Sequence, residues 1–307
     1  MNLKTNNIFY HITMKLLVHI TYYSNETRVD KIKKRPSDLF DKDSQQWRDH
    51  VYEGVLKVIS AINNYDKSMF HEIMVVVNMN MENTYDKKLL EDVAKMDLEE
   101  GVVVKIDKSI PPHHPFYLTT VHRKQIEDCV EDYDWFLYTE DDNLVPFETM
   151  KQMVTSMEPI YEKSGYLIGP TRMVFDENKN VFYSDIQKSS RREDVIKVFD
   201  GDDGRGSCYI IKPTNTYSGC WMYPKNIMKE FIVSLEWQIP NQKHMIREKM
   251  AWGFKKDKRM ILLGSLNGFP IKPKNSFVYH LGFSGDYYLK PSGGAGWHTL
   301  KENLLVI

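Results

Sequence analysis

The chain has 307 residues, and 41 Lys and Arg against 42 Asp and Glu give a formal net charge of -1. This balance gives no global field that would favour nucleic acid or acidic membranes. The three cysteines, an odd and widely spaced set, contain no Cys-x-x-Cys pattern and suit a reducing compartment. No apolar run approaches the ~20 residues that span a bilayer. We therefore expect a cytoplasmic protein without a transmembrane segment.

Strands and helices alternate through the first half of the chain. Apolar runs predict strands over 15–21, 72–78, 102–106 and 135–139. Apolar residues at helical spacing predict helices over 45–63, 86–97 and 116–131. This alternation predicts an α/β fold, in which helices flank a mostly parallel central sheet.

The second half of the chain is less regular. We predict short strands over 165–170, 208–212, 216–223 and 276–280, and helices over 224–233 and 242–254. Residues 1–13 precede a second start-like Met14 and are expected to be a ragged extension. With no repeat and no linker in the pattern, residues 14–307 are predicted to form a single domain.

The fourth predicted strand runs directly into three consecutive acids, Glu140, Asp141 and Asp142. Three adjacent carboxylates repel one another unless a positive charge lies among them. A divalent cation relieves this repulsion, and oxygen ligands suit Mg²⁺ or Mn²⁺. The alternative is a solvated acidic turn at the end of a strand.

Other polar and aromatic residues also fall where predicted strands end. Thr21, Tyr22 and Tyr23 close the first strand, Asn78 closes the second, and His280 closes the last. The carboxyl ends of parallel strands meet at one edge, where such sheets bind ligands. There Tyr22 or Tyr23 could stack on a nucleotide base, and Asn78 could hydrogen-bond its edge.

His280 is followed by a glycine-containing loop that includes Ser284. Imidazole is a good additional ligand for Mn²⁺, and glycine lets a backbone approach a phosphate closely. We therefore predict that His280 helps to hold the metal and that Ser284 lies near the phosphates. The alternative for His280 is a histidine satisfied within a strand.

Three sequence blocks carry a resemblance to a known family. The segments His114–Thr119, His122-Arg123 and Tyr133–Asp142 resemble an "HPF-LT-HR … EDD" block of GT-A fold glycosyltransferases. That block occurs in small enzymes of microbes and of large algal viruses. Tyr217–Trp221 and Ile246–Glu248 are similar to further pieces of the group. The resemblance covers about residues 15–290.

The resemblance implies transfer of a sugar from a nucleotide diphosphate sugar, with a UDP or GDP donor, to a glycan acceptor. It divides the domain into a nucleotide-sugar-binding half (14–145) and an acceptor-binding half (146–307). Glu140, Asp141 and Asp142 would be the D-x-D equivalent, although a strict D-x-D has Asp at both outer positions. Asp142 would hold the metal, and Asp141 would contact ribose, or metal through water.

By the same resemblance, Arg123 would contact the donor nucleotide. Its alternative is a helix-surface arginine paired with Glu127.

An inverting transfer also needs a base that deprotonates the acceptor hydroxyl. By resemblance, Glu248 is the first candidate and Glu236 the second; both could instead be solvated helix carboxylates. Trp221, beside Gly219 on the acceptor side, could serve as a sugar platform. The alternative for Trp221 is a core tryptophan.

Two other functions remain open. A sugar-phosphate nucleotidyltransferase has a similar first half, but it carries a glycine-rich loop after the first strand, and residues 22–26 contain no glycine. A non-catalytic carbohydrate-binding protein of the same fold is the other alternative.

Overall fold

A five-stranded sheet forms the centre of the protein in the computed structural model. The residues described are 13–22, 45–79, 84–108, 115–175, 181–183, 195–199, 208–213, 219–238, 253–255, 258–266, 269–273, 277–280 and 299–300. The strand order is β11-β4-β1-β2-β3. The strands are β1 (Met14–Tyr22), β2 (Phe70–Met79), β3 (Val102–Asp107), β4 (Trp135–Glu140) and β11 (Cys220–Pro224). Strands β1 to β4 are parallel, and β11 is antiparallel to β4.

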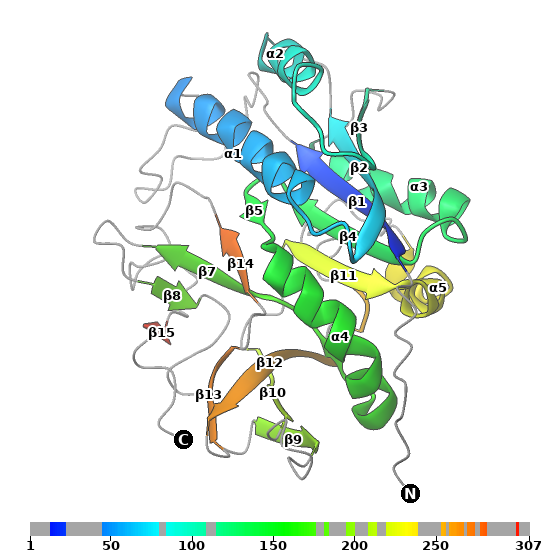
Figure 1. Cartoon of the computed structure of the whole chain (residues 1–307), viewed down its shortest axis with the longest axis vertical. Coiled ribbons are helices and arrows are strands. Elements are labelled where there is room, and N and C mark those ends of the chain that lie inside the picture. The colour runs from blue at the N-terminus through cyan, green and yellow to red at the C-terminus, as the bar shows by residue number, and fades with distance from the viewer. Residues whose placement is uncertain are drawn as a thin grey trace, which may run out of the picture.

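Helices cover both faces of this sheet. They are α1 (Gln45–Asn63), α2 (Thr84–Val93), α3 (Val121–Cys129), α4 (Phe147–Ser164) and α5 (Lys225–Ile232), with 3₁₀ turns η1 (Pro115–Thr120) and η3 (Leu235–Trp237). Figure 1 shows α1 and α4 crossing the near face, while α3 and α5 lie behind the sheet. The prediction of a mixed α/β fold with a mostly parallel, helix-flanked central sheet is confirmed.

Two smaller sheets come from the second half of the chain. One has the order β13-β12-β10-β9, with β6 on β12; the other has the order β15-β8-β7-β14-β5. Their strands are β5 (Asn143–Leu144), β6 (Leu167–Ile168), β7 (Thr171–Phe175), β8 (Val181–Tyr183), β9 (Val195–Phe199), β10 (Cys208–Ile211), β12 (Arg259–Leu266), β13 (Phe269–Pro273), β14 (Phe277–His280) and β15 (Thr299–Leu300). Because β11 joins the central sheet, the two predicted halves interleave.

Most predicted elements of the first half are present, with shifted ends. The helix predicted from Phe116 begins as the 3₁₀ turn η1 and becomes α-helical only at Val121. Helix α4 was not anticipated, because Pro159 interrupts a pattern whose buried residues include Met150, Met153 and Met157. Proline inside a helix normally argues against one. Of the helix predicted over 242–254, only the last two residues are described, and Gly253 has a φ of 72°.

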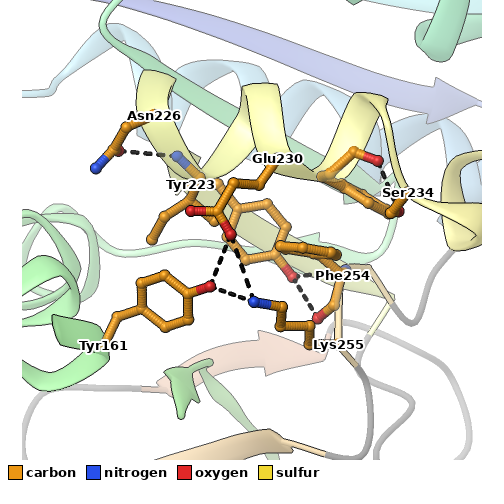
Figure 2. A network of polar contacts seen from close by, with 9 residues as sticks. Tyr161, Tyr223, Asn226, Glu230, Ser234, Phe254 and Lys255 are labelled. Carbon is orange, nitrogen blue, oxygen red and sulfur yellow. Dashed lines mark hydrogen bonds and ion pairs between the residues drawn. The ribbon is translucent and has the colours of Figure 1, made fainter. Parts of the chain in front are cut away.

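A polar network fixes the ends of α4 and α5 to the short segment 253–255 (Figure 2). The Tyr161 hydroxyl donates to Glu230 Oε2 at 2.7 Å. Lys255 Nζ lies 3.4 Å from the same carboxylate oxygen and also donates to the Tyr161 hydroxyl. Burial lowers the pKa of Lys255, but the Tyr161 hydrogen bond and the Glu230 charge outweigh it, so the net pKa is raised. Lys255 therefore stays charged and holds the network together.

Two glycines with positive φ, Gly101 and Gly165, offer a matched test of the backbone contact between Gly101 and His71. Gly101 has φ 80°, and a Cβ there would lie 2.2 Å from the His71 carbonyl oxygen; Gly165 has φ 69° and open space around it. Gly165→Ala should lower the free energy of unfolding by about 1–2 kcal/mol, from backbone strain alone. Gly101→Ala should lower the free energy of unfolding by about 1–3 kcal/mol more, because its Cβ also collides with the His71 carbonyl. Urea unfolding measures both, and equal losses would contradict the backbone contact.

Candidate functional site

The carboxyl ends of the parallel strands form one row of polar residues. In the register, Thr21 of β1 lies between Asn78 of β2 and Glu140 of β4, and Asp107 of β3 lies beside Asn78. Register partners point to the same face of a sheet, so these four residues share the face covered by α3. The structure therefore brings Thr21, Asn78 and Glu140 together, as the strand ends predicted.

The three acids Glu140, Asp141 and Asp142, called the acidic turn below, are held by backbone hydrogen bonds from both neighbouring strands. Glu140 N–H donates to the Gly219 carbonyl at 3.0 Å, and Asp141 N–H donates to the Thr21 carbonyl at 3.2 Å. Gly219 has φ 61°, and a Cβ there would lie 2.7 Å from Glu140 Oε2. Only glycine allows the β11 backbone to approach the Glu140 carboxylate this closely. Gly219 thus borders the acids, a position that sequence reasoning had linked to the acceptor.

Strand β14 brings the late histidine to the same turn. His280 is the register partner of Asn143 in an antiparallel pair, so its backbone lies beside the residue that follows Asp142. Glu140, Asp141 and Asp142 are partly exposed. Among the side chains that the structure describes, no three His, Cys, Asp or Glu residues are grouped as metal ligands. The His280 side chain lies outside that description, and the predicted metal remains a prediction.

A row of aromatic rings lies next to these polar strand ends, called the polar edge below, one step further into the sheet. His19 and Tyr138 are register partners two residues before Thr21 and Glu140. The Thr21 hydroxyl bonds the Tyr138 hydroxyl at 3.3 Å. His122 of α3 packs against both rings, with centroids 4.4 Å from Tyr138 and 6.0 Å from His19. Sequence reasoning gave neither histidine a role, although His19 shares the alternation that places Thr21 on this face.

Burial keeps both histidines neutral. It lowers the pKa of His19 to about 3, with Asp107 opposing the shift. It also holds the pKa of His122 well below its usual value, and the neighbouring Arg123 and His19 add to this effect.

Two aromatic residues predicted for the site are buried instead. Tyr22 is 1% exposed, so its ring is covered and does not offer a stacking face. Trp221 is 2% exposed. Its ring stacks with Tyr138 and with Tyr223, at centroid distances of 5.6 Å and 5.2 Å. The predicted sugar platform does not fit this geometry, because the indole is almost fully covered by protein; Trp221 is a core residue.

Arg123 is buried and joins α3 to η3. Its Nη1 donates to the Glu236 carbonyl at 2.7 Å, and its guanidinium lies 4.6 Å from the Trp237 ring centroid. The predicted surface pairing with Glu127 is replaced, because that carboxylate accepts from the Trp237 indole at 2.5 Å. Burial lowers the pKa of Arg123 to about 10. Its contact with a donor nucleotide stays a prediction.

For the two candidate bases, Glu236 and Glu248, the described residues show no contact with the polar edge. The Glu236 side chain is exposed on η3. Glu248 lies outside the described residues, as do Tyr23 and Ser284.

The comparisons with known proteins found no family and, among solved structures, a weak likeness. No protein-family model matches the chain, and no curated protein matches its sequence. Among solved structures, it is similar to a "putative nucleotide-diphospho-sugar transferase" from Desulfovibrio desulfuricans G20, at 8% identity and a TM-score of 0.27. The match covers 54% of this chain and 60% of that chain, less than two thirds of its length. A likeness at this level assigns no function. Across the described residues, no helix is both long and apolar enough to cross a membrane.

The buried histidines predict acid-sensitive stability. Their pKa values are lower in the folded state than in the unfolded chain, so the unfolded state takes up protons first. This contribution is present above about pH 6.5 and is lost as the pH falls below it. At pH 5, His19 should cost about 2 kcal/mol of stability relative to pH 7.5, and His122 adds a loss in the same direction. Urea unfolding of the wild type and His122→Phe should show a shallower loss in the variant, and parallel losses would contradict this.

Proposed function

We propose that the protein transfers a sugar from a nucleoside diphosphate sugar to an acceptor hydroxyl, with inversion at the sugar carbon. The observation that supports this most is the row at the carboxyl edge of the sheet, where Thr21, Asn78 and Glu140 are in register. Open α/β sheets bind ligands at this edge. The acidic turn and the paired strand that carries His280 end at the same place.

The residues present suit a divalent cation. Asp142 and His280 would hold Mn²⁺ or Mg²⁺, with Glu140 as a further carboxylate; oxygen and imidazole donors suit Mn²⁺. The pairing of His280 with Asn143 supports this set, because it brings residues far apart in sequence to one turn. A bound cation would neutralise the negative charge that develops on the leaving diphosphate.

The other residues of the edge would bind and orient the donor. Thr21, Tyr23 and Asn78 would contact its base and ribose, with uridine and guanosine both allowed, and Asp141 would contact ribose, or metal through water. Ser284 would lie near the phosphates. Glu248 would accept the proton of the acceptor hydroxyl, with Glu236 as the second candidate.

Replacing Asp142 tests the cation site. UDP or GDP with Mn²⁺ should raise the melting temperature of the wild type, because a ligand that binds only the folded state stabilises it. Asp142→Asn should lose this metal-dependent shift, whereas Asp132→Asn, at the other end of β4 and exposed, should retain it. The proposal fails if no nucleoside diphosphate stabilises the wild type with or without metal. Turnover of a nucleotide sugar separates transfer from mere carbohydrate binding, and use of a nucleoside triphosphate with a sugar phosphate would indicate nucleotidyl transfer.

Gly219 tests the geometry of the acids without changing any charge. A Cβ would lie 2.6 Å from Asn143 Nδ2 and 2.7 Å from Glu140 Oε2, so Gly219→Ala must displace the carboxylate. We expect at least about tenfold weaker Mn²⁺-dependent nucleotide binding, which corresponds to about 1.4 kcal/mol. Gly165→Ala is the control, since it has a similar φ and no neighbour at the site. Unchanged binding by Gly219→Ala in calorimetry would argue against Glu140 in the site.

A further inference from the structure

His19 makes a direct contact with a residue of the polar edge. Its Nδ1 lies 3.2 Å from Asn78 Nδ2, and both residues are buried, at 1% and 0% exposure. An amide nitrogen can only donate, so Nδ1 must be the acceptor in this contact. The imidazole proton is then on Nε2, and the Asn78 carboxamide is turned with its nitrogen toward His19.

The other end of the Asn78 carboxamide is left without a partner. Asn78 Oδ1 is buried and accepts no hydrogen bond. A buried acceptor without a donor is costly, so a ligand N–H that reaches this oxygen would gain more than one that replaces an existing bond. Because Asn78 is fully buried, a ligand can reach this oxygen only if the residues that cover it move.

The His19 side chain is well suited to hold this orientation. It stays neutral, since burial lowers its pKa to about 3, so Nδ1 keeps the lone pair that Asn78 uses. Its ring is packed by His122, with centroids 6.0 Å apart. The neighbouring edge residue is held in the same manner, because the Thr21 hydroxyl bonds Tyr138 of the same row.

We propose that His19 is a positioning residue that fixes the Asn78 oxygen as a hydrogen-bond acceptor and so selects donor bases that carry a ring N–H. This inference rests on the proposed nucleotide-sugar function. Uracil and guanine have an N–H on their pairing edge, at N3 and N1. Cytosine and adenine have a lone pair at the equivalent ring nitrogen, which would face the Asn78 oxygen. The site should therefore bind uridine or guanosine diphosphate in preference to cytidine or adenosine diphosphate.

Binding of the four nucleoside diphosphates tests this by calorimetry in the presence of Mn²⁺. The wild type should prefer UDP or GDP over CDP and ADP by about tenfold or more. His19→Phe keeps a ring but removes Nδ1, so the carboxamide can turn and the preference should fall to about threefold or less. His19→Gln supplies an oxygen that can accept from Asn78 Nδ2 and should restore part of the preference, which a purely structural role would not explain.

His122→Phe is the matched control, because it removes an equally buried imidazole that packs on the same rings. It should retain the wild-type preference. The inference is overturned if the wild type binds all four nucleotides equally or prefers CDP or ADP, or if His19→Phe and His19→Gln both keep the wild-type preference. Either result leaves the proposed function standing. If no nucleotide binds the wild type, the proposed function fails and this inference fails with it.

Discussion

The in-register pairing of β1 with β2 and β4 is the constraint on which the candidate site depends. It aligns Thr21 with Asn78 on one side and with Glu140 on the other. Because side chains alternate along a strand, a slip of one residue would turn His19 and Thr21 to the opposite face. The apolar residues Leu16, Val18 and Ile20, all fully buried, would then move as well. Core burial on one face therefore fixes the polar row on the other.

The polar edge lies on an aromatic second row. His19 and Tyr138 contact Asn78 and Thr21, and His122 packs against both rings. Trp221 extends this row through its stack on Tyr138. Trp221 is not a sugar platform because its ring is buried in this row, where it packs beneath the strand ends. Because its two imidazoles are buried and neutral, this packing loses stability as the pH falls.

The sequence predicted the central sheet well, because buried parallel strands are continuous apolar runs and the helices between them are strongly periodic. The convergence of Thr21, Asn78 and Glu140 followed from the strand ends alone. Helix α4 was missed because it contains Pro159. The burial of Tyr22 and Arg123 could not be read from the sequence, since a polar tip or charge on a periodic position says nothing of what packs over it. The Gly219 approach to Glu140 depends on long-range pairing of β11, which no local pattern encodes.

The central claim is that the acidic turn and His280 hold a cation against a nucleoside diphosphate. The most direct measurement is anomalous diffraction from crystals grown with Mn²⁺ and UDP or GDP. The account predicts one manganese peak at the carboxyl edge of the central sheet, bonded to Asp142 and His280 and to the diphosphate oxygens. Ordered crystals in which nucleotide and manganese are absent from that edge, or bind elsewhere, would contradict it.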